Sequence, residues 1–164
     1  MNEPDRLKTT TREDSLFLKQ PTDKTCVHTC LAMIVGESVD YVIDYLSNDG
    51  PLCAEDMIIF LAHHGIYLSF FAQARSGQTL NLQGDDLLEV QLPLRDRPAL
   101  ITVRSERFLG KLHQCFWDGR NVQDPNPLVQ GPRGLKSYDI VEFWPLLLTE
   151  QRFAAVENAW RSYD

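Results

Sequence analysis

The chain has 164 residues, a formal net charge of −7 and a hydrophobic content of 43%. This length predicts one domain with an adequate core, and the acidic balance argues against a general nucleic-acid binder, whose binding surface is basic. No stretch approaches the roughly 20 apolar residues that span a bilayer, and the polar start MNEPDRLKTTTREDS lacks the apolar core of a signal peptide. We therefore expect a cytoplasmic protein without a membrane partner. Export as an effector by a specialised secretion system stays open, because such signals have no defined composition.

Residues 1–14 are polar and charged, and we interpret them as a flexible N-terminal arm. Residues 15–164 show neither a repeat nor a low-complexity linker, so they predict a single domain. Without a signal peptide, the four cysteines are expected to be reduced thiols. The oligomeric state stays open.

Helical spacing of apolar residues predicts three helices in the first half of this domain, at Cys26–Val35, 39–47 and 54–64. Gly36 fits the C-cap of the first helix and Ser38 the N-cap of the second. The stretch 20–36 is the centre of the functional argument, because a loop with Gln20 and a turn-forming Pro21 leads directly into the first helix.

The second half is predicted to be mainly extended. An Asp118-Gly119 turn is a hairpin signal. The expected strands are 66–72, 98–103, 112–118 with its hairpin partner 120–123, and 144–148; segment 137–143 fits either a short helix or a strand, and further helices are expected at 84–91 and 150–161. Helices followed by an antiparallel sheet predict an α+β fold.

Cys26 is expected at the N-terminus of the first helix, where unpaired N–H groups and the helix dipole lower a thiol's pKa. A cysteine nucleophile also needs a base, an orienting group and oxyanion donors. The predicted hairpin pairs Trp117 roughly with Arg120 and so places His113 near Asp124. His113 is therefore the candidate base, and Asp124 the group that orients it.

The order Gln20, Cys26, His113, Asp124 resembles papain-like cysteine peptidases. The local pattern is closest to the bacteriocin-processing (double-glycine leader) peptidase family and its stand-alone relatives, in which a Gln precedes the nucleophilic Cys by the same six residues. An apolar helix with Leu31-Ala32-Met33 and Gly36 follows here as it does there, and Asp124-Pro125 matches the Asp-Pro of that family's second motif. The family usually has Asp-Cys-Gly where this chain has Thr25-Cys26-Val27.

The resemblance implies a papain-like fold of helices packed on an antiparallel sheet, and a cysteine peptidase acting on a peptide or protein. It assigns Cys26 as nucleophile, His113 as base, Asp124 as orienting residue and Gln20, with the backbone N–H of Cys26, as the oxyanion hole. No metal or organic cofactor is implied. The same four residues also suit a deamidase, transglutaminase or acyltransferase, since these enzymes share an acyl-thioenzyme and differ in what resolves it.

A zinc-stabilised binding module is the rival interpretation. Cys30 lies one helical turn after Cys26, and Cys115 shares a strand face with His113. These four residues have suitable ligand types for zinc, although their spacing differs from common structural zinc motifs. Without zinc, Cys30 and Cys115 are expected to meet in the core as packed thiols or as an occasional disulfide.

Overall fold

A computed structural model describes residues 17–69, 72–73 and 97–148 of the chain. These ranges cover the three helices predicted in the first half and nearly all of the predicted sheet. The predicted arm at 1–14 and the helices expected at 84–91 and 150–161 lie outside the described residues.

Within the described part of the first half, three helices follow one another, as predicted: α2 (Cys26–Val35), α3 (Val39–Leu46) and α4 (Ala54–His63). Gly36 ends α2 in the left-handed region at φ 77°, a conformation that glycine adopts without steric cost. Ser38 begins α3, and its hydroxyl accepts a hydrogen bond from the N–H of Tyr41 at 3.1 Å. Local capping chemistry therefore sets the end of α2 and the start of α3.

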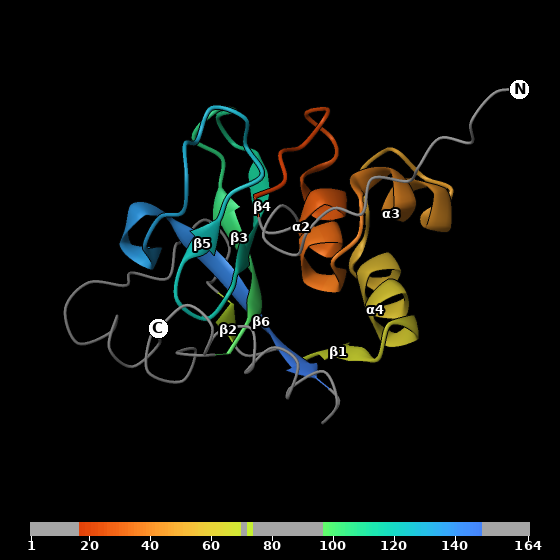
Figure 1. Cartoon of the computed structure of the whole chain (residues 1–164). Helices are drawn as coiled ribbons and strands as arrows, with labels where there is room; N and C mark the ends of the chain where they lie inside the picture. The colour runs from red at the N-terminus through yellow and green to blue at the C-terminus, as the bar shows by residue number, and fades with distance from the viewer. Residues whose placement is uncertain (1–16, 70–71, 74–96, 149–164) are drawn as a thin grey trace, which may run out of the picture.

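The described strands form one antiparallel sheet in the order β1-β6-β3-β4-β5, with β2 also paired to β6. Their bounds are β1 (Ile66–Leu68), β2 (Ala72–Gln73), β3 (Ala99–Arg104), β4 (Leu112–Trp117), β5 (Val122–Gln123) and β6 (Ile140–Leu148). Figure 1 shows the three helices gathered on one side of this sheet. The predicted α+β class is confirmed; its assignment to papain-like proteins stays a prediction.

Alternate residues of the central strands build two separate cores, because successive side chains point to opposite faces of a sheet. The core under the helices contains Leu31, Phe60, Leu100, Phe116 and Leu146. The core on the other face contains Ile101, Cys115, Trp117, Ile140 and Phe143. Helix α2 packs along β4, and this contact brings the start of the helix to the start of the strand.

The β4–β5 hairpin is offset by two residues from its predicted register. Trp117 pairs with Val122, where the sequence predicted a partner near Arg120. The connection is longer because the carboxylate of Asp118 accepts hydrogen bonds from the N–H groups of Arg120 and Asn121, both at 2.8 Å. A two-residue offset preserves the face to which each side chain points. Consequently Asp124, directly after β5, stays on the same face as His113.

Two other segments differ in detail from the prediction. The strand expected at 66–72 consists of β1 and β2, with residues 70–71 outside the described part. The ambiguous segment 137–143 holds the end of a 3-10 helix, η1 (Leu135–Ser137), and the start of β6. A register shift opposite Thr102 and Val103 interrupts the pairing of β3 with β6. The irregularity lies at the start of β6, between Ile140 and Glu142.

No single helix within the described residues is long and apolar enough to cross a membrane, whereas the sharply bent pair of α2 and α3 satisfies the length and composition test.

Candidate active site

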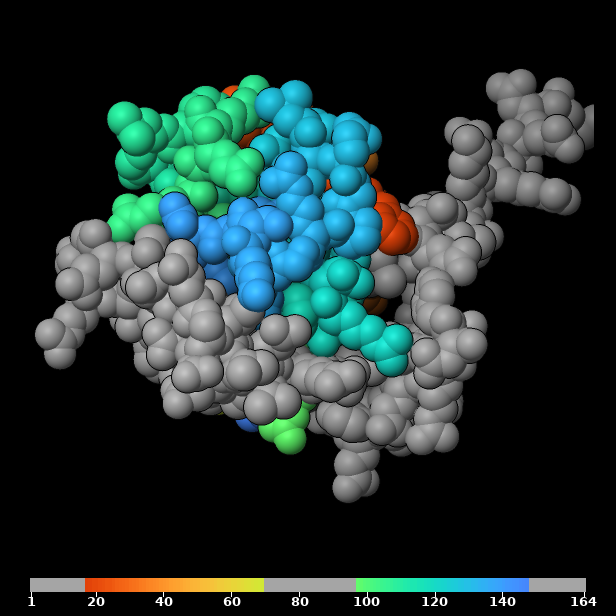
Figure 2. All heavy atoms as spheres, turned by 90° about the vertical axis from the view of Figure 1, so that its left-hand side faces the viewer, coloured from red at the N-terminus to blue at the C-terminus, as the bar shows by residue number. Residues whose placement is uncertain are grey.

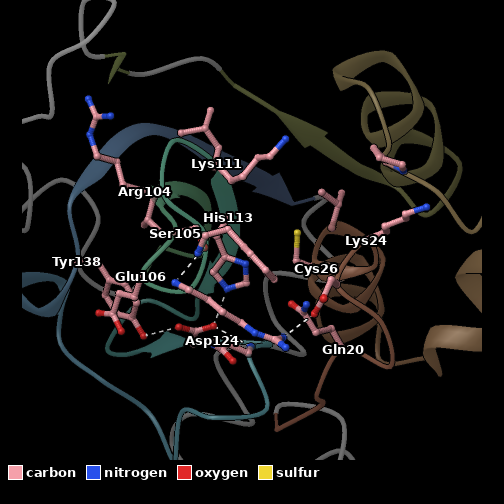
Figure 3. Close-up of a pocket in the computed structure, with 18 of the residues that line it drawn as sticks. Gln20, Lys24, Cys26, Arg104, Ser105, Glu106, Lys111, His113, Asp124 and Tyr138 are labelled. Atoms are coloured by element: carbon pink, nitrogen blue, oxygen red, sulfur yellow. Dashed lines mark hydrogen bonds and ion pairs between the residues drawn. The ribbon is translucent and has the colours of Figure 1, made fainter.

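A cleft of about 650 Å³ opens where the N-terminus of α2 meets the start of β4. Its lining residues come from segments 20–27, 51–52, 103–113 and 124–126, together with Tyr138. All four residues that the sequence selected as a site, Gln20, Cys26, His113 and Asp124, are among them. Figure 3 shows the imidazole of His113 lying between the sulfur of Cys26 and the carboxylate of Asp124.

The β3–β4 connection at 105–111 forms one wall of the cleft and is tied to its neighbours by two ion pairs. Arg107 reaches Asp23 in the loop before α2, with 2.5 Å between Nη1 and Oδ1. Glu106 reaches Arg133 in the segment after β5 at 3.5 Å. Figure 2 shows these two segments, green and cyan to blue, lying side by side on one face of the molecule.

Cys26 is the first residue of α2 and is partly buried. The first turn of this helix contains no acidic residue, and the Thr25 side chain makes no cap hydrogen bond to it. The hydroxyl of Thr25 donates to the carbonyl of Thr22 at 2.9 Å. Since the first four N–H groups of a helix lack intrahelical acceptors, the helix terminus favours negative charge at Cys26.

The surroundings of Cys26 favour its thiolate form. Burial alone would raise the pKa of the thiol. Four interactions lower it: with the His113 side chain, with the backbone N–H of Gln114, with the charge of His113 and with the backbone N–H of Val27. The pKa of Cys26 therefore lies below its ordinary value.

His113 lies between Asp124 and Cys26 (Figure 3). Its Nε2 lies 2.7 Å from Oδ1 of Asp124, and the other side of the ring faces the sulfur of Cys26. Burial lowers the pKa of His113, but the hydrogen bonds and charges of Asp124 and Cys26 raise it to about 9. A lowered thiol pKa beside a raised imidazole pKa favours a thiolate–imidazolium pair.

Asp124 is buried at the end of β5, and it reaches His113 diagonally across the hairpin. Continuing the β4–β5 register places Asp124 opposite Cys115, two residues along the strand from His113. Burial raises the pKa of this carboxyl, but hydrogen bonds from His113, the Asn126 N–H and Tyr138, together with the charge of His113, lower it overall. Asp124 is therefore ionised over the pH range in which His113 is protonated and the pair can form.

Gln20 lies beside Cys26 in the cleft (Figure 3) and is buried. Its Nε2 donates one hydrogen to the carbonyl of Thr22 at 3.0 Å. A side-chain amide carries two hydrogens, and this contact uses one of them. The Oε1 of Gln20 has no hydrogen-bond partner among the described residues. This arrangement is compatible with a donor to an oxyanion.

Comparison with known proteins found no matching family model, no significantly similar curated protein and no significantly similar solved structure.

The residues that lie close enough together to bind one metal ion differ from the zinc set suggested by the sequence. His113, Cys115 and Asp124 place one ligand atom each within 4.8 Å of one another, whereas the suggested set combined Cys26 and Cys30 with His113 and Cys115. One feature of this trio opposes metal binding: the Nε2 of His113 is engaged by Asp124 at 2.7 Å.

The remaining cysteines have local structural roles. All four cysteines, each within the described residues, are free thiols. Cys30 donates to the carbonyl of Gln114 at 3.4 Å under the helices, and Cys115 lies in the core on the other face. The expected meeting of Cys30 and Cys115 in one core is therefore wrong, because the sheet separates their clusters. Cys53 is exposed at the N-cap of α4.

The histidines outside the cleft also have partners. His28 is buried in α2, with Nε2 2.7 Å from the carbonyl of Asn48. His63 and His64 near the C-terminus of α4 contact the hydroxyls of Tyr45 and Tyr41 respectively. These contacts explain the histidines without a role at the cleft.

Sequence reasoning missed three groups that contact the candidate site residues. The N–H of Gln114 contacts Cys26, the N–H of Asn126 donates to Asp124 at 2.8 Å, and the hydroxyl of Tyr138 donates to Asp124 at 3.0 Å. The spacing Asp-Pro-Asn at 124–126 is a usable signal for the second contact, since Asp side chains often bond an N–H two residues on. Tyr138 carries no such signal, because its approach depends on the fold.

Proposed function

We propose that this chain is a cysteine-dependent hydrolase, in its simplest form a peptidase. The observation that carries the proposal is the position of His113, which is hydrogen-bonded through Nε2 to Asp124 and lies beside the sulfur of Cys26 in an open cleft. A nucleophile, a base and an orienting carboxylate in this order are the recurring parts of thiol hydrolysis. The resemblance of the 20–36 and 112–125 segments to papain-like peptidases supports the same proposal.

In the first half of the proposed reaction, the Cys26 thiolate attacks the carbonyl carbon of the substrate and a C–S bond forms. The Nε2 of Gln20 and the N–H of Cys26 would donate to the resulting oxyanion. The imidazolium of His113 then gives its proton to the leaving nitrogen, the C–N bond breaks and the amine departs. Asp124 holds the imidazolium in orientation throughout.

In the second half, water attacks the thioester carbon while neutral His113 takes its proton. The C–S bond breaks, the carboxylic acid leaves, and the thiolate–imidazolium pair returns. If an amine resolves the thioester, the enzyme is a transglutaminase or acyltransferase. If the leaving group is the ammonia of a side-chain amide, it is a deamidase. These alternatives use the same residues, so products have to separate them.

The decisive experiment is mass spectrometry of a mixture of candidate peptides and proteins incubated with wild type or with Cys26→Ala. Cleavage supports a peptidase, a mass increase of about one dalton supports a deamidase, and a cross-link supports a transferase. The absence of any Cys26-dependent product across a broad mixture argues against the proposal. Stoichiometric zinc in the purified protein, lost on Cys115→Ser, would instead favour the zinc-stabilised binding module.

A further inference from the structure

The carboxylate of Asp124 receives hydrogen bonds on both of its oxygens. Oδ1 accepts from Nε2 of His113 at 2.7 Å and from the N–H of Asn126 at 2.8 Å. Oδ2 accepts from the hydroxyl of Tyr138 at 3.0 Å. Donors on Oδ1 alone leave the carboxylate able to turn about the bond to its carboxyl carbon. A donor on Oδ2 fixes the plane of the group as well.

Tyr138 approaches Asp124 from the side opposite Cys26, as Figure 3 shows. Its backbone is held in place on both sides. The N–H of Tyr138 donates to the carbonyl of Leu135 at 3.2 Å, and Leu135 is buried. The neighbouring carbonyl of Asp139 accepts from the N–H of Arg104 in β3 at 2.9 Å. The phenol therefore belongs to a segment that is fixed to the sheet. Its ring packs against the core on the face of the sheet away from the helices.

The hydroxyl of Tyr138 keeps its proton at every pH at which the site is active. Burial and then the charge of Asp124 raise the pKa of the phenol far above its ordinary value. Tyr138 is thus a permanent donor to Asp124, and it does not compete with His113 for a proton.

We propose that Tyr138 is a positioning residue: its hydroxyl holds the Asp124 carboxylate so that Oδ1 faces His113, and it thereby orients the imidazole toward Cys26. This inference rests on the proposed function, because it concerns the same three residues. Tyr138 reaches the reacting atoms only through Asp124 and His113, so its effect depends on both of them. That dependence can be measured without knowing the substrate.

The test is the pH dependence of Cys26 alkylation by iodoacetamide, followed by peptide mass spectrometry. Tyr138→Phe removes one oxygen atom and keeps the ring. Without the hydroxyl the carboxylate supports the imidazolium less well, so the apparent pKa of Cys26 should rise and alkylation at mildly acidic pH should slow about tenfold, as for the loss of a hydrogen bond to a charged group. Tyr67→Phe on β1, whose side chain is exposed, is the matched control and should change nothing.

A double-mutant cycle separates positioning from packing. In an Asp124→Ala background, Tyr138→Phe should have no further effect on the alkylation profile, because the carboxylate it acts on is gone. An effect of equal size in both backgrounds, or no effect in either, would overturn the inference. Thermal unfolding curves in the same buffers identify the pH range in which each variant is folded, and rates are compared only there.

The failure of this inference is distinct from failure of the proposed function. If His113→Ala slows alkylation and Tyr138→Phe does not, the three-residue site stands and Tyr138 is only a packing residue. If His113→Ala leaves alkylation unchanged, the proposed function itself fails, and the positioning role fails with it. A second, label-free reading is the NMR titration of the His113 imidazole, whose pKa should fall in Tyr138→Phe and stay constant in Tyr67→Phe.

Discussion

The backbone N–H of Gln20 donates a hydrogen bond to the carbonyl oxygen of Pro125, with 2.8 Å between the two atoms. One residue earlier, Nζ of Lys19 donates to the backbone carbonyl of Asp124 at 2.7 Å. The loop before the nucleophile is therefore joined to the segment that carries the carboxylate. Neither hydrogen bond uses the side chain of Gln20 or Asp124. Substitutions of these two side chains therefore test their roles in the reaction and keep both hydrogen bonds.

The first prediction concerns which cysteine reacts. At mildly acidic pH, iodoacetamide should label Cys26 before the others, because its pKa is lowered whereas Cys30 and Cys115 are buried and have raised pKa values. Cys53 is exposed, so accessibility alone would favour it. Peptide mapping by mass spectrometry distinguishes the two, and earlier labelling of Cys53 would show that the site is wrongly assigned.

His113→Ala should slow the labelling of Cys26 sharply, since it removes the hydrogen bond and the charge that lower the thiol pKa. His64→Ala is the control, because His64 lies at the end of α4, contacts Tyr41 of α3 and is away from the cleft.

With a substrate, kcat/KM should follow a bell-shaped pH profile. Its acid limb reflects the thiol of Cys26, and its alkaline limb, near the His113 pKa of about 9, reflects loss of the proton for the leaving group.

The second prediction is that Gln20→Ala lowers kcat by roughly 10²–10³, the usual cost of removing one oxyanion donor. The loss should be smaller than for Cys26→Ala, because Gln20→Ala keeps both the thiolate nucleophile and the N–H donor of Cys26. KM should change little, since the oxyanion exists only along the reaction path. Gln130→Ala, an exposed glutamine in the segment after β5, is the matched control.

Gln20→Glu sharpens this test because it preserves the size of the side chain. A carboxylate has no N–H to donate, and its charge opposes a neighbouring oxyanion, so activity should fall at least as far as in Gln20→Ala. Activity close to wild type in Gln20→Glu would exclude the oxyanion role. Unfolding curves should show that both variants stay folded, since the backbone bond to Pro125 is kept.

The sequence predicted those features of the fold that depend on local chemistry. Helix α2 begins at Cys26 and ends before Gly36 as expected, because the left-handed cap at Gly36 follows from the residue itself. The predicted hairpin register was wrong for a reason that is also local: the Asp118 carboxylate accepts hydrogen bonds from two N–H groups and lengthens the turn. His113 and Asp124 still met because an error of two residues preserves the face of a strand.

Two long-range features could not be predicted from the sequence. The sheet divides Cys30 from Cys115, and only the tertiary packing of α2 on β4 decides this. Tyr138 follows a 3-10 helix and precedes an irregular strand, so no periodic pattern indicated that its hydroxyl reaches Asp124. Contacts between residues that are distant in sequence depend on how the elements pack, and a single sequence contains little information about that.

The third prediction concerns stability and pH. The pKa of His113 rises from 6.5 to about 9 on folding, so the protonated form is bound more tightly in the native state. The resulting stabilisation is fully present below pH 6.5 and is lost as the pH rises to about 9, with an upper limit of about 3 kcal/mol. The lowered pKa of Cys26 acts in the opposite direction in the same range, since the stabilisation of its thiolate is gained as the pH rises. The contribution of Asp124 is lost only at acid pH, as the pH falls through its folded pKa.

Chemical denaturation near pH 6.5 and near pH 9 measures the change attributed to His113. Because Cys26 offsets this change in wild type, the comparison is made in a Cys26→Ala background. Cys26→Ala should lose unfolding free energy between the two pH values, and the double variant with His113→Ala should lose much less. An equal slope in the two would show that Asp124 does not hold His113 as an imidazolium.

The fourth prediction concerns Val27, which stands where the resembling family has glycine. Its side chain is partly buried, lines the cleft directly beside Cys26 and packs against the core under the helices. Val27→Ala should widen the cleft at this point. Substrates with a large side chain beside the scissile bond should therefore gain in kcat/KM, while substrates with a small side chain there should change little. Comparing a peptide series graded in side-chain size measures this difference.

Val39→Ala is the matched control for Val27→Ala, because Val39 packs against the same core without lining the cleft. Both variants should lower the thermal midpoint by a few degrees, about 2–4 °C for each kcal/mol lost in a chain of this size. Only Val27→Ala should change the preference between large and small substrates. An equal gain for every substrate, or the same change in Val39→Ala, would mean that Val27 does not limit the cleft and that loosening of the core is responsible.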